Sequence, residues 1–213
     1  MTCKIFNSPT ITFYDNIMKS NFFHCSSCEF IFKDATSYVS TERELQQYEN
    51  HNNSFESPGY VQMFQDFMDV TIAPYRHEIK TALEFGSGPG PVLAELLKRE
   101  GFEVDLYDKY FSPEKVYKNK QYDLITSTEV IEHIDNTLEL FSFFKTHLKS
   151  GGYLALMTQF HDNTQEGFLK WWYRKDPTHI TFYRPHTFKV LAEKFDFTLL
   201  NFDHKKTVLL QRK

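Results

Sequence analysis

The sequence predicts an α/β fold, with a mostly parallel sheet covered by helices and a small β-rich module in front of it. From Thr81 onward, short apolar runs alternate with segments of helical periodicity, which is typical of parallel strands joined by helices. The first 34 residues instead contain two short aromatic and β-branched runs and all three cysteines. We therefore predict a cysteine-containing module over 1–40, a helical connector over 41–80 and an α/β domain over 81–213.

The expected elements follow from periodicity and from turn residues. Strands are expected at residues 11–14, 30–32, 82–85, 103–107, 122–127, 153–158, 198–202 and 207–211. Helices are expected at residues 42–49, 61–72, 91–100, 136–148 and 185–194. The helix at 61–72, for example, places Val61, Phe64 and Met68 on one face. Ser150-Gly151-Gly152 indicates a turn before the strand at 153. The last two strands are joined by only four residues, which predicts an antiparallel hairpin.

Composition excludes several classes of protein. With 213 residues, of which 41% are hydrophobic, the chain can bury one sizeable core. A net charge of -4 gives no general attraction to phosphate backbones or anionic lipid, so neither nucleic acid nor a membrane is the expected partner. No apolar run approaches the roughly 20 residues of a membrane span, and the N-terminus lacks the apolar stretch of a signal peptide. We expect a cytoplasmic protein.

A glycine-rich segment joins a predicted strand to a predicted helix. It reads Ala82-Leu83-Glu84-Phe85-Gly86-Ser87-Gly88-Pro89-Gly90. Glycine permits positive φ and, because it lacks Cβ, lets a ligand approach the backbone. Pro91 suits the first turn of the helix, where its missing N–H breaks no hydrogen bond. Such a loop is also compatible with a plain tight turn, so the neighbouring acidic residues decide the interpretation.

Two acidic residues favour a bound nucleoside with a cationic group. Asp108 follows the second strand of the domain, 22 residues after Gly86, where an acid can accept hydrogen bonds from ribose hydroxyls. Glu84 precedes the glycines, where a carboxylate can lie near the amino and sulfonium groups of S-adenosylmethionine. A dinucleotide-binding loop would place a pyrophosphate at the helix N-terminus and would gain nothing from that carboxylate. We therefore predict S-adenosylmethionine as the cofactor.

Five motifs between about Thr81 and Thr158 together resemble the class I S-adenosylmethionine-dependent methyltransferases. They are Glu84-Phe85-Gly86-Ser87-Gly88-Pro89-Gly90, Tyr107-Asp108, Tyr122-Asp123-Leu124-Ile125, Glu129-Val130-Ile131-Glu132-His133 and Leu148-Lys149-Ser150-Gly151-Gly152-Tyr153. The resemblance implies a Rossmann-like methyltransferase sheet, whose antiparallel seventh strand fits the predicted hairpin. It also implies a set of cofactor contacts. These are Glu84, Gly86, Ser87, Gly88, Gly90, Asp108, Thr128 and Glu129.

The sequence departs from the family between Asp108 and Tyr122. The family has a helix and a third strand in this place, and that strand ends in an acidic residue that contacts adenine. Only residues 109–121 are available here. We therefore expect a reduced or irregular sheet edge, and either weaker cofactor binding or an adenine covered by another segment.

Two histidines are the candidates for catalysis. Methyl transfer from a sulfonium is an in-line displacement that mostly needs alignment, and it needs a base only when the nucleophile must lose a proton. His133 follows the fourth strand of the family pattern, near the edge where open α/β sheets bind ligands, although it could equally cap or pack a helix start. The resemblance implies that the segment 171–183 belongs to a substrate lid, with His179 of Asp176-Pro177-Thr178-His179 pointing towards the reaction centre as a base or an orienting group.

The other residues of segment 171–183 have two interpretations each. Its aromatic side chains either build a pocket that excludes water or pack the last helix onto the sheet, as is at least equally expected for Trp171, Phe182 and Tyr183. Arg174 and Lys175 either bind an anionic substrate or are solvated charges, and solvated charges are the more common case.

The three cysteines predict a possible metal site. Cys25-Ser26-Ser27-Cys28 has the spacing of a zinc knuckle, and Cys3 lies a loop's length before it. The layout resembles the N-terminal zinc ribbon that precedes some methyltransferases. Phe6 stands where a fourth cysteine would be, which leaves His24 as a candidate fourth ligand. A vacant site and, less in keeping with the context, a redox pair are the alternatives.

We therefore predict methyl transfer from S-adenosylmethionine to an oxygen, nitrogen or carbon atom of a small molecule. The main alternative is a catalytically silent methyltransferase fold that serves as a binding or regulatory module, with the cysteine module contacting a partner protein. A weaker alternative is RNA methylation through a basic patch, because the same lysines could form a solvated loop. The lysines concerned are Lys109, Lys115, Lys118 and Lys120.

Overall fold

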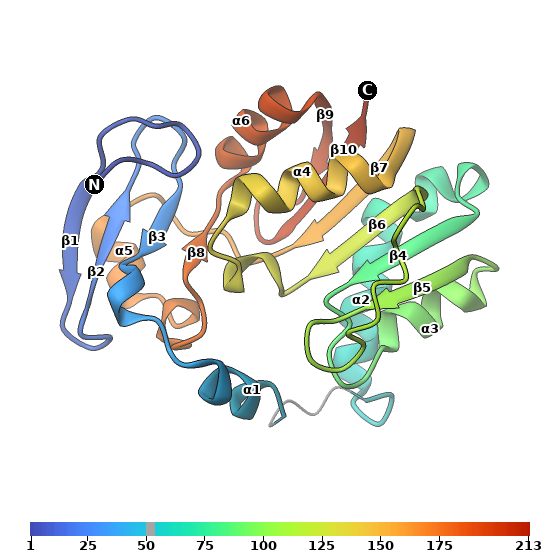
Figure 1. Cartoon of the computed structure of the whole chain (residues 1–213), viewed down its shortest axis with the longest axis horizontal. Coiled ribbons are helices and arrows are strands. Elements are labelled where there is room, and N and C mark those ends of the chain that lie inside the picture. The colour runs from blue at the N-terminus through green and yellow to red at the C-terminus, as the bar shows by residue number, and fades with distance from the viewer. Residues whose placement is uncertain (50–53) are drawn as a thin grey trace.

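The computed structural model describes residues 1–49 and 54–213, which form two sheets and the helices around them (Figure 1). The strands are β1 (Ile11–Asp15), β2 (Ser20–His24), β3 (Ile31–Lys33), β4 (Thr81–Phe85), β5 (Glu103–Tyr107), β6 (Tyr122–Thr128), β7 (Leu148–Met157), β8 (Thr181–Phe182), β9 (Phe197–Phe202) and β10 (Thr207–Arg212). The α-helices are α1 (Thr41–Glu49), α2 (Pro58–Thr71), α3 (Val92–Arg99), α4 (Thr137–His147), α5 (Gln165–Lys170) and α6 (Pro185–Phe195).

The larger sheet has the strand order β5-β4-β6-β7-β10-β9. β4 pairs in parallel with β5 and β6, and β6 pairs in parallel with β7. β10 runs antiparallel to both β7 and β9. The turn of this hairpin is closed by Asp203, whose Oδ1 accepts hydrogen bonds from the backbone N–H groups of Lys205, Lys206 and Thr207. The predicted fold class, a mostly parallel sheet with a closing antiparallel hairpin, is confirmed.

Helices cover both faces of this sheet because successive strand residues point to opposite sides. On one face, Leu83 and Ile125 lie in a cluster with side chains of α4 and α6 such as Phe141. On the other face, Ala82 and Leu124 lie in a cluster with side chains of α2 and α3. In the described residues no helix is long and apolar enough to cross a bilayer.

The sheet ends at β5 on the side where the sequence departs from the family. Residues 109–121 contain no strand, and their single β-type pairing is an isolated bridge between Asp108 and Ser112. A further strand and its helix need more chain than these residues provide, because a parallel crossover takes a dozen or more residues before the next strand begins. The expected reduction of this sheet edge is therefore observed.

Two local expectations need correction. Ser150-Gly151-Gly152 is not a turn before a strand: these residues lie inside β7, where the pairing with β6 shifts register between Tyr122 and Leu124. The sequence analysis also missed β2, β8 and α5. These elements have only five, two and six residues, too few for periodicity to identify them.

The smaller sheet joins the N-terminal strands to a later segment of the chain. Its order is β1-β2-β3-β8, and β8 pairs antiparallel with β3 through Ile31 opposite Phe182. The three cysteines belong to the same buried cluster as Phe141 of α4 and Phe188 of α6. The division of the chain at residue 40 stays a prediction, and the two parts share one core across it.

Candidate active site

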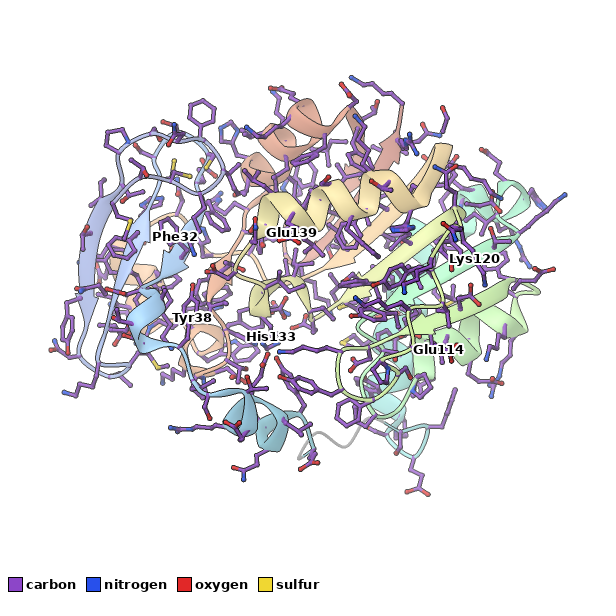
Figure 2. The ribbon with its side chains drawn as sticks, in the orientation of Figure 1. Phe32, Tyr38, Glu114, Lys120, His133 and Glu139 are labelled. Carbon is purple, nitrogen blue, oxygen red and sulfur yellow. The ribbon has the colours of Figure 1, made fainter. Side chains whose placement is uncertain are left out.

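A cavity of about 650 Å³ lies at the carboxyl ends of β4, β5 and β6. Residues of α1 and α2 and of the segment 172–179 complete its walls. The cavity brings together nine of the ten residues predicted for cofactor binding and catalysis. They are Glu84, Gly86, Ser87, Gly88, Asp108, Thr128, Glu129, His133 and His179. Gly90 is not among the lining residues. Figure 2 shows His133 in the middle of the molecule, above α1 and away from the N-terminal sheet.

The glycine loop adopts a backbone that side chains would prevent. Gly86 has φ of +85°, and a Cβ added there would lie 2.3 Å from Cγ2 of Val130. The Gly86 N–H donates to the Tyr107 carbonyl at 2.7 Å. The loop is therefore wedged between the end of β5 and the segment after β6, and glycine is required for that close approach.

Asp108 organises the backbone around the cavity. Its Oδ2 accepts a hydrogen bond from the N–H of Gly88 at 2.9 Å. Its Oδ1 accepts from the N–H groups of Tyr110 at 2.8 Å and Phe111 at 3.0 Å. A carboxylate offers about four lone-pair sites, so it retains capacity for a ribose hydroxyl.

Glu84 provides a direct test of whether the cavity fits S-adenosylmethionine. Its side chain is only 3% exposed, and its Oε2 has no hydrogen-bond partner among the described residues. Burial raises the pKa of Glu84 to about 8, and the charge of Asp108 adds to the rise. An orphaned buried carboxyl oxygen is costly, and a cationic group beside it would remove that cost. The residues fit a ligand with an ammonium or sulfonium group.

A carboxyl pair lies at the cavity: Glu129 is a lining residue, and its neighbour Glu132 is completely buried. The hydroxyl of Tyr173 is 2.8 Å from Oε2 of Glu129 and also contacts Oε1 of Glu132. Burial raises the pKa of both glutamates, and the charge of Glu129 adds to the rise at Glu132. Because the hydroxyl has one proton to donate, one carboxyl group must keep its own proton for both contacts to be hydrogen bonds.

The two catalytic candidates are neighbours. The ring centroids of His133 and His179 are 4.7 Å apart. Nδ1 of His133 lies 3.1 Å from the carbonyl oxygen of Thr178, and Nδ1 of His179 lies 2.8 Å from that of Tyr173. A carbonyl only accepts, so Nδ1 carries a proton in both rings and Nε2 carries the lone pair when each ring is neutral. Their catalytic role stays a prediction.

Some residues of segment 171–183 are packed in the core, and others line the cavity. Phe182 and Tyr183 are completely buried, as the packing interpretation expected. Trp172 is 66% exposed and lines the cavity beside Tyr173. Arg174 is not a solvated charge: it is 1% exposed and forms an ion pair with Asp15 of β1 at 2.9 Å. The N-terminal sheet therefore holds this wall of the cavity in place.

Several residues in or next to the cavity had no role assigned from the sequence. Glu132 lies in the motif Glu129-Val130-Ile131-Glu132-His133. Its short spacing from Glu129 could have indicated that the two carboxyl groups lie close together. Tyr173 was one aromatic residue among several in its segment. From α1, Glu44 accepts a hydrogen bond from Lys109 at 3.0 Å, and Tyr48 packs its ring 5.2 Å from that of His133. Nothing in the periodicity of α1 indicated contact with a distant loop.

The three cysteines are gathered in the N-terminal part. The Sγ atoms of Cys3, Cys25 and Cys28 all lie within 4.8 Å of one another, and all three residues are buried. The backbone N–H groups of Ile5 and Phe6 each point at the Cys3 Sγ from 3.4 Å. His24 does not belong to the group, because its Nε2 lies 3.0 Å from the side-chain oxygen of Asn163.

Solved structures with a similar fold include several methyltransferases. A SAM-dependent methyltransferase from Archaeoglobus fulgidus is 14% identical, with a TM-score of 0.55 over 81% of this chain and 100% of that chain. DesVI of Streptomyces venezuelae is 11% identical, with a TM-score of 0.55 over 83% and 100%. The mitomycin 7-O-methyltransferase MmcR is 13% identical, with a TM-score of 0.53 over 72% and 54%, so this chain spans about half the length of MmcR. These likenesses show the fold.

The sequence itself matches one protein family. Residues 60–201 match the family described as a methyltransferase domain, and the matched region holds the glycine loop, Asp108 and both histidines. No curated protein matches the chain in sequence. The chain belongs to the methyltransferase domain family, whose expected cofactor is S-adenosylmethionine.

Proposed function

We propose that this protein transfers a methyl group from S-adenosylmethionine to a small molecule inside the cavity. One observation carries the proposal: a single cavity is lined by the glycine loop, by the buried carboxyl of Glu84, whose Oε2 has no partner among the described residues, and by the His133–His179 pair. S-adenosylmethionine supplies a methyl group on a positively charged sulfur. The protein's task is then to hold and align the two reactants and to exclude water.

On the cofactor side, we assign the methionine part to the glycine loop and Glu84, and the ribose to Asp108. Thr128 and Glu129 face the cofactor from the end of β6, and Gly90 shapes the start of α3 without lining the cavity. Tyr110 and Phe111 line the cavity just beyond β5, where the missing third strand would contact adenine. Their rings offer flat apolar surfaces for a base.

On the acceptor side, the imidazole rings of His133 and His179 line the cavity, where they can orient a nucleophile or take its proton. Trp172, Tyr173 and Tyr48 supply aromatic wall around them, which favours a small molecule with apolar surface. An oxygen acceptor is in keeping with MmcR, which is named for O-methylation of mitomycin.

The four lysines that suggested RNA methylation do not form an open basic patch. Lys109 pairs with Glu44 at 3.0 Å and Lys120 pairs with Asp105 at 2.7 Å. Two of the four charges are thus offset by acids, which leaves little local field to attract a phosphate backbone. The small-molecule acceptor is favoured.

We also propose that Cys3, Cys25 and Cys28 bind a zinc ion, with a water or a hydroxyl in the fourth position. Three thiol groups within 4.8 Å suit tetrahedral zinc, and N–H groups aimed at Sγ stabilise a thiolate. The Ser8 hydroxyl, 3.2 Å from the Cys25 Sγ, is the candidate oxygen ligand. Metal analysis should find one zinc per chain in the wild type and none in Cys25→Ser. A metal-free wild type in a zinc-supplemented preparation would contradict the assignment.

The cofactor assignment is tested by calorimetric titration with S-adenosylmethionine and S-adenosylhomocysteine. We expect micromolar binding, about −8 kcal/mol, which falls at least tenfold in Asp108→Asn. The matched control is Asp105→Asn, because Asp105 lies on β5, just before Asp108, but bonds to Lys120 and Tyr122 outside the cavity. A well-folded wild type that binds neither ligand would favour the silent binding module. Equal loss in both variants would contradict the role of Asp108.

A further inference from the structure

A group of nitrogen and oxygen atoms on the acceptor side has the composition of a metal site. One carboxyl oxygen of Glu132 and one ring nitrogen each of His133 and His179 all lie within 4.8 Å of one another. Nε2 of His133 is 4.0 Å from Oε1 of Glu132. Two imidazoles and one carboxylate are a common ligand set for divalent first-row metals.

The hydrogen bonds of the two histidines orient both rings for such a role. Nδ1 of each ring lies at a backbone carbonyl, that of Thr178 or of Tyr173, so Nε2 is the ring nitrogen that can act as a metal ligand. Metal-binding histidines generally donate their other N–H to a carbonyl or carboxylate, which fixes the ring orientation. The protein backbone thus supplies the outer hydrogen bonds that a metal site needs.

A second, independent observation points to a missing cation. Glu132 is completely buried, and its Oε2 has no hydrogen-bond partner among the described residues. The Oε1 of neighbouring Glu129 is also buried and unpartnered there. Two buried carboxyl groups that meet at one tyrosine hydroxyl are poorly compensated by hydrogen bonds, whereas a nearby divalent cation would favour the charged form of both.

We propose that Glu132, His133 and His179 bind a divalent cation beside the cofactor, and that the methyl acceptor is an oxygen compound that coordinates this cation. Three protein ligands leave coordination positions open towards the cavity. Hard and borderline cations fill such positions with oxygen donors, so vicinal hydroxyls or a hydroxyl beside a carbonyl are the acceptor groups that fit. The acceptor part rests on the proposed function, and the metal part does not.

The test is titration of the chelator-stripped full chain with Mn²⁺, followed by the electron paramagnetic resonance signal of unbound Mn²⁺. Mn²⁺ is chosen because thiolates bind it weakly, so the cysteine cluster contributes little. We expect one bound Mn²⁺ per chain and at least a tenfold weaker affinity in Glu132→Gln and in His179→Gln. Pulsed spectra should show imidazole nitrogen couplings that diminish in His179→Gln.

His161→Gln is the matched control. His161 is also a buried histidine whose ring bonds a backbone carbonyl, that of Glu29 at 2.8 Å, but it does not line the cavity. Its replacement should leave Mn²⁺ affinity unchanged. Circular dichroism identifies any variant that fails to fold, and Glu132→Gln preserves the size of the side chain, so at least one informative variant should fold.

The outcomes separate this inference from the proposed function. If the wild type binds S-adenosylhomocysteine but no Mn²⁺ at millimolar concentration, or if neither substitution weakens Mn²⁺ binding, the metal site is wrong and the methyltransferase proposal stands. If Mn²⁺ binds at these residues but S-adenosylhomocysteine does not, the metal site stands and the proposed function fails. Acetohydroxamate, a bidentate oxygen ligand, should alter the spectrum of bound Mn²⁺. An unchanged spectrum would overturn the acceptor class.

Discussion

The two sides of the cavity are built in different ways. The cofactor side comes from one stretch of chain, in which the glycine loop, Asp108 and the end of β6 follow one another at the edge of one parallel sheet. The acceptor side combines Glu132 and His133 after β6 with Tyr173 and His179, which lie more than 40 residues later. The first is therefore set by local sequence and sheet topology, and the second depends on long-range packing.

The N-terminal sheet supports the acceptor side of the cavity. Asp15 of β1 pairs with Arg174, and β3 pairs with β8 just after His179. Both contacts hold the segment that supplies Tyr173 and His179. None of the hydrogen bonds described for the glycine loop and Asp108 involves residues 1–40, so the two sides should respond differently when the N-terminal sheet is loosened.

The largest expected effect comes from breaking the buried ion pair. Arg174→Met would leave Asp15 buried and without its counter-charge, which should lower the free energy of unfolding by about 3–5 kcal/mol. Denaturant unfolding measures the loss. Under native conditions S-adenosylhomocysteine affinity should change only a few-fold, because Arg174 bonds to the Leu169 carbonyl and pairs with Asp15, and neither residue belongs to the glycine loop.

Glu166→Ala is the control for that variant. It breaks the exposed pair between Glu166 and Lys170, for which the expected cost is below about 1 kcal/mol. A parallel loss of stability and cofactor affinity in a folded Arg174→Met would show that the two sides of the cavity are not independent.

The next largest effect is expected in the glycine loop. Gly86→Ala combines a φ of +85° with a Cβ 2.3 Å from Val130, which should cost about 2–4 kcal/mol and greatly weaken cofactor binding. Gly101→Ala isolates the backbone part, because Gly101 has φ of +91° but no neighbour within 4 Å of an added Cβ. The melting temperatures of Gly86→Ala and Gly101→Ala should differ by an amount that reflects the steric clash with Val130. Adding Val130→Ala to Gly86→Ala should recover part of the lost stability. Equal melting temperatures would contradict the close approach.

The smallest expected effect concerns Glu84 and is best measured as the number of protons released when the ligand binds. Burial raises its pKa from 4.5 to about 8, so the folded protein holds this proton at pH 7. A ligand ammonium beside the carboxyl lowers the pKa again, and binding of S-adenosylhomocysteine at pH 7 should release roughly one proton. Calorimetry in buffers of different ionisation enthalpy measures that number. Glu84→Gln should abolish the release and weaken binding by about 1.5–3 kcal/mol. Proton release that persists in Glu84→Gln would assign it to another group.

The same pKa shift predicts how stability depends on pH. The folded protein retains the Glu84 proton between pH 4.5 and about 8, whereas the unfolded chain loses it. The contribution of Glu84 to the free energy of unfolding is therefore complete below pH 4.5 and is lost as pH rises through 8. Unfolding curves of Glu84→Gln should lack this part of the pH dependence.

The sequence predicted the parallel sheet, the hairpin and the shortened edge because each depends on near neighbours in the chain. Strand and helix periodicity, a glycine loop between them and a connection of known length are local quantities. His133 was found from its place after the fourth strand and His179 from the family resemblance, as two separate candidates. Their adjacency was not predictable, because ring packing at 4.7 Å depends on where segment 171–183 folds back.

What the sequence determined by itself is the scaffold and the place of the proposed cofactor side, where parallel strands bring consecutive motifs to one edge of the sheet. Only the tertiary structure decided that β8 completes the N-terminal sheet, that Arg174 is buried on Asp15, and that Glu132 and Tyr173 join the two histidines. The physical reason is that a buried charge or carboxyl group must find its partner wherever the fold provides one, and that partner can be any distance away along the chain.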